Sequence, residues 1–436
     1  MNQAYFTFCC SGEGKSLSGL GGDRVRAAVK GASETGLALY KQYCSYPQYS
    51  QASKNEQTQE TALVTNSFDK LVFGTAAPET DSQRFLAHSV YAVPDKETLR
   101  EGNYFSHLIY PVPDSWSIRT ALEMWGSPFW VTQDSDDISP ELPSIDESEI
   151  PFGIINESSF VGFLRSSPAR QKKFFFLLKS LMTLKPKDKI VLIGLPEEAA
   201  FCLWGATRCL PSPMWNNITF STHEKPTLSF SFDVVNYLQP TTFENQDEYI
   251  FSELSRRPNI LLYSENSQFP SSNLPDFSFA NDILEVSVNG EFQLLDDFYK
   301  AIPERLKKSG AALQLFWTFT NHQEQISCRD IGEALKIPEL KTQAIETLMD
   351  ASRFSLDNQL KFYSSLDAQR QDVLLNRLIS ENSIEQIRSN EQYSNMLISA
   401  LKKPEEPKAP EEPERPEKKP SFLQNVFAII KKALFG

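Results

Sequence analysis

The sequence has little cysteine and histidine, and neither is clustered. Six Cys and four His are scattered over 436 residues, and no two Cys have the Cys-x-x-Cys spacing. A structural zinc site therefore lacks its usual ligands. Few, scattered Cys are typical of a reduced, cytosolic chain rather than of a disulfide-stapled one. We expect no metal and no other cofactor.

Positive charge and long hydrophobic runs are also scarce. Lys and Arg number 43 against 56 Asp and Glu, which gives a formal net charge of −13. This balance argues against nucleic-acid binding, because neutralising phosphates needs a basic surface. No stretch reaches the roughly 18 apolar residues of a membrane-spanning helix, and the N-terminal residues lack the basic region and apolar run of a secretory signal. We therefore expect a cytoplasmic protein.

What the sequence does have is ordinary globular composition in a chain long enough for several domains. Hydrophobic residues make up 40% of the chain and charged residues 23%. This composition is enough to bury a sizeable core, and the length favours two to three domains. The predicted fold class is α+β: a β-rich N-terminal domain, an α/β middle domain, a helical C-terminal region, a Pro-rich linker and a terminal amphipathic helix.

Residues 1–130 are predicted to form an N-terminal α+β domain with an antiparallel sheet. Short apolar and aromatic runs at strand-like spacing carry this prediction, and a helix is predicted at residues 23–42, where Val25, Val29, Leu37 and Leu39 would form an apolar side. The predicted strands cover residues 3–10, 62–65, 70–74, 85–93 and 104–111.

An acidic linker at residues 131–154 is predicted to separate this domain from an α/β middle domain at 155–281. The linker combines like charges with Pro and no apolar periodicity, which is typical of a solvated spacer. In the middle domain, helices are predicted at residues 160–184 and 196–210. Its predicted strands cover residues 189–194, 218–222, 228–235 and 260–263.

Residues 282–401 change to helical spacing with short polar turns and no fixed repeat period. This pattern favours an irregular helical bundle or stack over a consensus solenoid. Asp367 and Ser383 are suited to begin helices as N-cap residues.

The tail combines a spacer with a short amphipathic helix. Within residues 402–420, Pro recurs at every third position from Pro404 to Pro416, which is the period of polyproline II. Residues 421–436 are predicted to form a helix too short to be stable alone, so we expect it to order on a partner groove or a membrane surface. Its predicted docking residues are Phe422, Leu423, Val426, Phe427, Ile429, Ile430 and Leu434.

A Gly-rich loop after the first predicted strand is a candidate nucleotide site. Gly12, Gly14, Lys15 and Ser16 resemble the second half of a phosphate-binding loop, but Cys9 stands where the full pattern needs Gly. The three further Gly at positions 19, 21 and 22 oppose the helix that would have to follow. The interpretation as a flexible loop stays beside that of a nucleotide site.

Histidine offers the only other chemistry in the N-terminal half. His88 and His107 lie in predicted apolar strands, where they suit either a structural role or a functional pocket. No Cys, Ser or Asp is visibly placed as a nucleophile with them.

Two segments resemble a known family. The first segment is similar to part of the N-terminal domain of bacterial GTPase-associated proteins of the first type. It covers residues 100–109, Arg100-Glu101-Gly102-Asn103-Tyr104-Phe105-Ser106-His107-Leu108-Ile109. The second segment is similar to part of that family's middle domain. It consists of Leu210-Pro211 followed by Ile218-Thr219-Phe220-Ser221-Thr222-His223. The two together anchor residues 1–240.

The resemblance implies a component of a bacterial conflict or antiphage defence system, encoded beside small GTPases. It implies an adaptor or regulator and supplies no catalytic residues. The candidate partner-binding residues are Arg100, Asn103, Tyr104, His107, Thr219 and Thr222.

The sequence therefore predicts a non-enzymatic adaptor associated with a small GTPase and carrying a tethered docking helix. The expected location is cytoplasmic, with peripheral attachment to the inner membrane through the tail left open. One alternative is a nucleotide-processing enzyme that uses the Gly-rich loop with His107. Another is a membrane-active effector that acts through the tail.

Overall fold

A computed structural model describes nine stretches of the chain, and the fold is α+β as predicted. The chain forms two compact units, Met1–Gln314 and Leu315–Gly436, which are treated separately below. The described residues are 1–9, 22–46, 68–76, 83–91, 104–135, 137–238, 245–265, 269–382 and 384–401.

One mixed sheet runs through the first unit. Its ten strands, in spatial order, are β10-β7-β9-β8-β3-β4-β5-β1-β2-β6. In chain order they are β1 (Asn2–Cys9), β2 (Gly22–Val29), β3 (Lys70–Ala76), β4 (Gln83–Tyr91), β5 (Tyr104–Tyr110), β6 (Glu141–Leu142), β7 (Lys189–Ile193), β8 (Phe220–Glu224), β9 (Val234–Tyr237) and β10 (Ile260–Tyr263).

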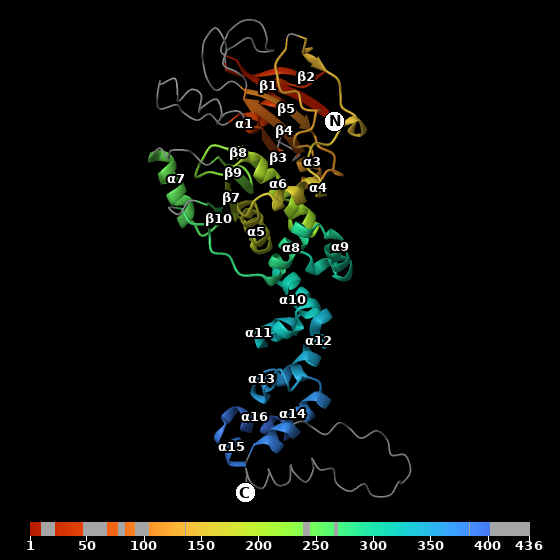
Figure 1. The fold of residues 1–436 in the computed structure, drawn as a ribbon, viewed down its shortest axis with the longest axis vertical. Helices are drawn as coiled ribbons and strands as arrows, with labels where there is room; N and C mark the ends of the chain where they lie inside the picture. Colours follow the sequence, from red (N-terminus) through yellow and green to blue (C-terminus); the bar gives the residue numbers. More distant parts are fainter. Residues whose placement is uncertain are drawn as a thin grey trace. The chain divides into compact units, whose positions relative to one another are not determined.

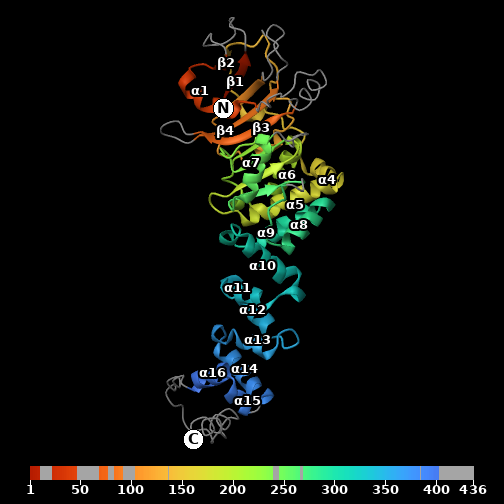
Figure 2. The same ribbon diagram turned by 90° about the vertical axis from the view of Figure 1, so that its left-hand side faces the viewer.

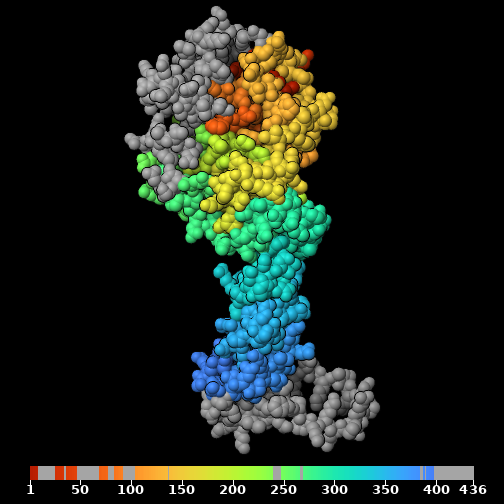
Figure 3. Space-filling view, in the orientation of Figure 1, coloured from red at the N-terminus to blue at the C-terminus, as the bar shows by residue number. Residues whose placement is uncertain are grey.

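The sheet has an antiparallel half and a parallel half. Strands β1 to β5 pair antiparallel, whereas β7, β8, β9 and β10 pair parallel. The halves join where β3 pairs antiparallel with β8, with Val72 opposite Ser221 and Phe73 opposite Phe220. The predicted N-terminal and middle domains therefore share one sheet, and their surfaces meet without a gap in the face shown in Figure 3.

Helices cover both faces of the sheet (Figures 1 and 2). Helices α1 and α7 lie on one face, where Leu37, Tyr40, Phe251 and Leu254 join one apolar core with strand residues such as Phe85. Helices α3, α5 and α6 lie on the other face. The helices are α1 (Glu34–Cys44), α3 (Ile118–Glu123), α4 (Glu157–Arg165), α5 (Pro168–Thr183), α6 (Pro196–Cys209), α7 (Asn245–Arg256), α8 (Ser278–Asn289), α9 (Phe292–Ala301) and α10 (Gly310–Asn321), which crosses the boundary between the units.

Two helix predictions are wrong in detail. Residues 22–29 form β2 rather than the start of a helix, because Val25 and Ala27 pair with Phe6 and Tyr5 of β1, a contact that local sequence does not encode. The predicted helix at 160–184 is two helices, α4 and α5. Pro168 has no backbone N–H to donate and stands at the first position of α5, which Ser167 caps.

The edge strand β10 is partly covered by neighbouring serines, and the other edge of the sheet ends in a very short strand. Along β10, Ser272 donates its backbone N–H to Leu262 O (2.8 Å) and accepts the Leu262 N–H on its hydroxyl (2.9 Å). The Ser271 hydroxyl accepts the Ser264 N–H (3.0 Å). At the other edge, β6 is only two residues long and is flanked by Pro140 and Pro143.

The second unit is a stack of short helices around its own apolar core, consistent with the predicted irregular bundle. Buried Phe319, Ile331, Leu348, Leu360 and Leu378 belong to this core. Its helices after α10 are α11 (Cys328–Ala334), α12 (Pro338–Met349), α13 (Leu356–Leu360), α14 (Ala368–Glu381), α15 (Ile384–Ser389) and α16 (Glu391–Leu401). Asp367 caps α14, as predicted, and Ser383 lies outside the described residues.

The close approach of α4 and α6 yields a stability prediction. A Cβ on Gly205 of α6 would lie 2.0 Å from the ring of buried Phe160, whereas a Cβ on Gly162 of α4 would meet nothing within 4 Å. Overpacking should outweigh the gain in helix propensity, so Gly205→Ala should lower the free energy of unfolding by about 1–2 kcal/mol.

Gly162→Ala is the matched control, because it changes the same residue type inside a helix without a clash. It should raise the free energy of unfolding by up to about 1 kcal/mol. Urea denaturation followed by circular dichroism compares the two variants, and equal effects of the two changes would contradict the packing argument.

Candidate functional site

A pocket of about 410 Å³ opens between helices α3, α4 and α6 and the segment before α4. We call it, together with the neighbouring exposed side chain of Ile154, the Phe152 site. Its lining combines aromatic, cationic and anionic side chains: Arg119, Glu123, Phe152, Gly153, Ile155, Asn156, Glu157, Trp204 and Arg208.

The backbone before α4 is fixed against the end of α3. Gly153 donates its N–H to Glu123 O (2.6 Å), and Ile154 donates to Trp125 O (2.9 Å). A Cβ on Gly153 would lie 1.9 Å from Trp125 O, so this close approach requires glycine. The neighbouring side chains are then directed outward, and Phe152 is 59% exposed and Ile154 51% exposed.

The two arginines of the pocket differ in their partners. The guanidinium of Arg208 makes two hydrogen bonds to the Asp296 carboxylate (2.8 and 2.9 Å) and a third to Glu157 (2.5 Å). Arg119 donates to Thr207 O and lies 5.4 Å from the Trp215 ring.

Arg119 forms no ion pair with any described residue, and its Nε is buried without a hydrogen-bond partner. Burial, and next the charge of Arg208, lower the pKa of Arg119 from its usual value. The pocket therefore contains a guanidinium that a carboxylate from outside would stabilise.

The sequence-predicted residues lie elsewhere. Tyr104, His107 and Thr222 are buried in the sheet, and Thr219 is half-buried and hydrogen-bonded to the Asp233 carboxylate (2.9 Å). The Thr222 hydroxyl accepts the Leu71 N–H (2.8 Å). The side chains of Thr222 and His107 bond neighbouring strands, and the structure brings none of the four residues to the Phe152 site.

The other predicted residues lie outside the described part of the chain. They are Arg100 and Asn103, the loop residues Gly12, Gly14, Lys15 and Ser16, and the tail residues Phe422, Leu423, Val426, Phe427, Ile429, Ile430 and Leu434.

His107 has a defined structural role on β5. Its Nδ1 accepts the Val131 N–H (3.3 Å), and its Nε2 then donates to Gln3 Oε1 (3.1 Å). Its ring stacks on Phe129 with centroids 4.8 Å apart. Both ring nitrogens are thus occupied, and burial, together with His88, lowers the pKa of His107 to about 3.

Sequence reasoning missed the residues of the Phe152 site. Phe152 and Ile154 lie at the end of the predicted acidic linker at 131–154. Two large apolar residues at the end of a solvated stretch are the signal that could have indicated an interaction site there. Arg119 and Trp204 carried no signal, because only the tertiary fold brings α3 and α6 together.

Comparisons with family models and with curated proteins assign this chain to no family, so the site is judged from its geometry. No family model matches the chain, and no curated protein matches it. Within the ranges that the structure describes, no group of three or more His, Cys, Asp or Glu side chains could hold a metal ion. No helix in those ranges is long and apolar enough to cross a membrane.

The buried His107 predicts a pH dependence of stability. Its pKa in the folded state lies below the value of 6.5 expected in the unfolded chain, so the unfolded state binds more protons between these values. Stability should fall as the pH drops from 6.5 toward 3, by at most about 1.4 kcal/mol per pH unit for this group.

His107→Gln should reduce this dependence, because an amide can still donate to Gln3 and accept from Val131 but does not titrate; His223, whose pKa burial also lowers to about 3, keeps the remainder. Urea midpoints of both proteins at pH 7.5, 6.0 and 5.0 measure the slope. Equal slopes would show that His107 does not contribute.

Proposed function

We propose that this chain is a non-enzymatic adaptor or regulator that binds a small GTPase of a bacterial conflict or antiphage defence system through the Phe152 site. One observation carries the choice of site: an exposed aromatic and an exposed aliphatic side chain sit beside a pocket that contains Trp204 and Arg119. Large exposed apolar side chains next to such groups are typical of interaction hot spots.

The chemistry of the site favours a protein partner with an apolar side chain beside an acidic one. Phe152 and Ile154 offer apolar area to the apolar side chain of the partner. Arg119, which has no ion-pair partner among the described residues, suits the carboxylate of the acidic one. Glu123 and Glu157 also line the pocket, so a partner bearing two adjacent carboxylates would be disfavoured.

The identity of the partner as a small GTPase is supported by the two family-like segments, at residues 100–109 and 210–223. In this proposal the protein is cytoplasmic. The tail at 402–436 supplies a second contact, either with another component of the system or with the inner membrane.

The proposal predicts the effect of charge in the Phe152 site. The double variant Phe152→Asp, Ile154→Asp should bind the small GTPase encoded beside it at least tenfold more weakly than the unmodified chain, because two apolar contacts are lost and carboxylates are placed in the interface. Isothermal titration calorimetry with the purified proteins measures this.

Tyr249→Asp is the matched control, because Tyr249 of α7 is also 59% exposed but lies outside the pocket. It should bind the GTPase like the unmodified chain. If the unmodified chain neither forms a complex with this GTPase nor alters its rate of GTP hydrolysis, the proposed function is wrong. Equal affinities of the double variant and the control would place the partner elsewhere on the chain.

Truncation separates the folded units from the tail. A chain that ends at Leu401 keeps every residue of the Phe152 site and should bind the GTPase with unchanged affinity. It should lose any association with vesicles that contain anionic lipids. Flotation of both chains with such vesicles tests this, and weaker GTPase binding by the truncated chain would make the tail part of the primary interface.

A further inference from the structure

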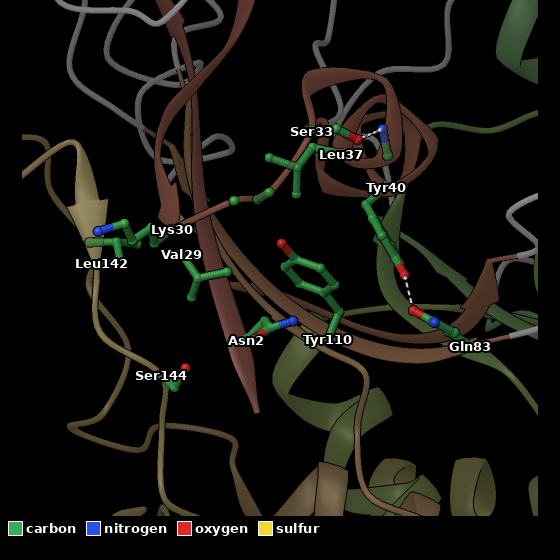
Figure 4. A pocket seen from close by; sticks show the side chains of 13 residues that line it. Asn2, Val29, Lys30, Ser33, Leu37, Tyr40, Gln83, Tyr110, Leu142 and Ser144 are labelled. Carbon is green, nitrogen blue, oxygen red and sulfur yellow. Dashed lines mark hydrogen bonds between the residues drawn. The ribbon is translucent and has the colours of Figure 1, made fainter.

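A second pocket lies at the end of the β1–β2 pair that contains Asn2 and Val29. It encloses about 520 Å³ and is bounded by the ends of β1, β2 and β5, the start of α1, and residues 142–144 (Figure 4). The register runs from Ala4 opposite Ala28 to Cys9 opposite Gly22, so Cys9 and Gly22 lie at the far end of this pair from the pocket.

The Tyr110 hydroxyl is the main polar group inside this pocket. The residue is only 9% exposed, its hydroxyl points into the cavity, and it has no hydrogen-bond partner among the described residues. A hydroxyl that faces a cavity without a partner among the described residues can donate to a ligand or to water. Burial, and next the neighbouring Tyr40, raise the pKa of Tyr110 to about 12, so the hydroxyl keeps its proton and can donate it.

The wall beside Tyr110 leaves a second donor available. Tyr40 donates its hydroxyl to Gln83 Oε1 (3.1 Å), so the amide nitrogen of Gln83 remains to donate to a ligand. The rings of Tyr40 and Tyr110 lie with their centroids 5.0 Å apart and their planes tilted by 41°, so they form an angled aromatic wall. A flat apolar group can pack against one face of this wall.

The upper rim offers one cationic side chain and the start of a helix. The pocket includes the first turn of α1, where the Ser33 hydroxyl accepts the Gly36 N–H (3.0 Å). The start of a helix carries a partial positive charge. The Lys30 side chain is 85% exposed, and among the described residues it pairs only with the Glu141 carboxylate, 3.9 Å from its ammonium.

Apolar side chains close the rest of the pocket. Val29, Leu37 and Leu142 line it, and Leu37 and Leu142 are buried. One cationic side chain and one helix start suit a single anionic group, and the aromatic and aliphatic walls suit an apolar body.

We propose that this pocket binds a small organic anion with one carboxylate or phosphate group on a planar body. The anionic group lies at Lys30 and the start of α1. The planar body lies against Tyr40 and Tyr110, and the Tyr110 hydroxyl donates a hydrogen bond to the ligand. The site is independent of the GTPase-binding proposal.

Matched pairs of probes test the charge requirement with the full-length protein. Phenyl phosphate is compared with phenol, and 4-hydroxyphenylacetate with 4-hydroxyphenylacetamide, by isothermal titration calorimetry at low salt. At least one anion should bind at least tenfold more tightly than its neutral counterpart. The anion that binds more tightly distinguishes a phosphate ligand from a carboxylate ligand.

Three variants locate the binding. Tyr110→Phe should weaken anion binding at least fivefold, and Lys30→Glu should do the same. Ser144→Trp places a large side chain from an exposed position into the pocket and should abolish binding without disturbing the core.

Two variants outside the pocket serve as controls. Tyr263→Phe removes a tyrosine hydroxyl that is bonded to Glu265, and Lys300→Glu reverses the charge of an exposed lysine on α9. Both should bind the anions like the unmodified chain. The proposal is overturned if neither anion binds more tightly than its neutral counterpart, or if Tyr110→Phe and Ser144→Trp leave the affinity unchanged.

Discussion

The pairing of β3 with β8 is the constraint on which the first unit depends, because it turns two small sheets into one. It is short, with two residue pairs in register, and side chains extend it. The buried Lys70 lies 2.9 Å from the Glu224 carboxylate and donates to Ser45 O (2.8 Å), which compensates its charge from two sides. Removing the Glu224 carboxylate would leave the Lys70 ammonium buried without this ion pair, so the joint tolerates little change there.

Aromatic side chains and a neutral histidine also surround this joint. Phe73 stacks on Phe220 across it, with ring centroids 6.1 Å apart. Next to it, burial and the charge of Lys70 lower the pKa of His223 to about 3, so this histidine stays neutral and adds no second positive charge. The pocket at Tyr110 lies in the antiparallel half of the sheet, and the Phe152 site lies beside α3 and α6 of the same unit.

Local pattern predicted most of the strands and failed where distant residues decide. The apolar runs at 70–74, 104–111 and 189–194 are strands, because alternation or continuous burial is visible in the sequence itself. Residues 22–29 contain good helix formers and became a strand only by pairing with β1. Tyr110 lies inside a predicted strand. The pocket that its hydroxyl faces is also lined by Asn2, Ser33 and Leu142, and no spacing rule connects these distant positions.

The acidic segment at 131–154 is predicted to be a spacer, but in the structure it is bonded to the sheet. Arg26 binds the Asp134 carboxylate (2.8 Å), Gln3 donates to Pro143 O (2.8 Å), and the N-terminal amine of Met1 donates to Ile145 O (2.8 Å). Its like charges suggested solvation, and most of its side chains are indeed exposed. Yet Leu142 and Ser144 line one pocket and Phe152 and Gly153 line the other, so a single stretch of chain contributes to both sites.

The serine side chains along β10 and the brevity of β6 limit how this protein can recognise others. An exposed strand edge recruits peptides and identical copies by extending the sheet, which also makes it an aggregation hazard. Here the backbone groups of Leu262 and Ser264 are already satisfied from within, and two residues between prolines offer no template. At these two places a partner is therefore recognised by side-chain complementarity rather than by extension of the sheet, and point mutation can retune such a surface without rebuilding the sheet.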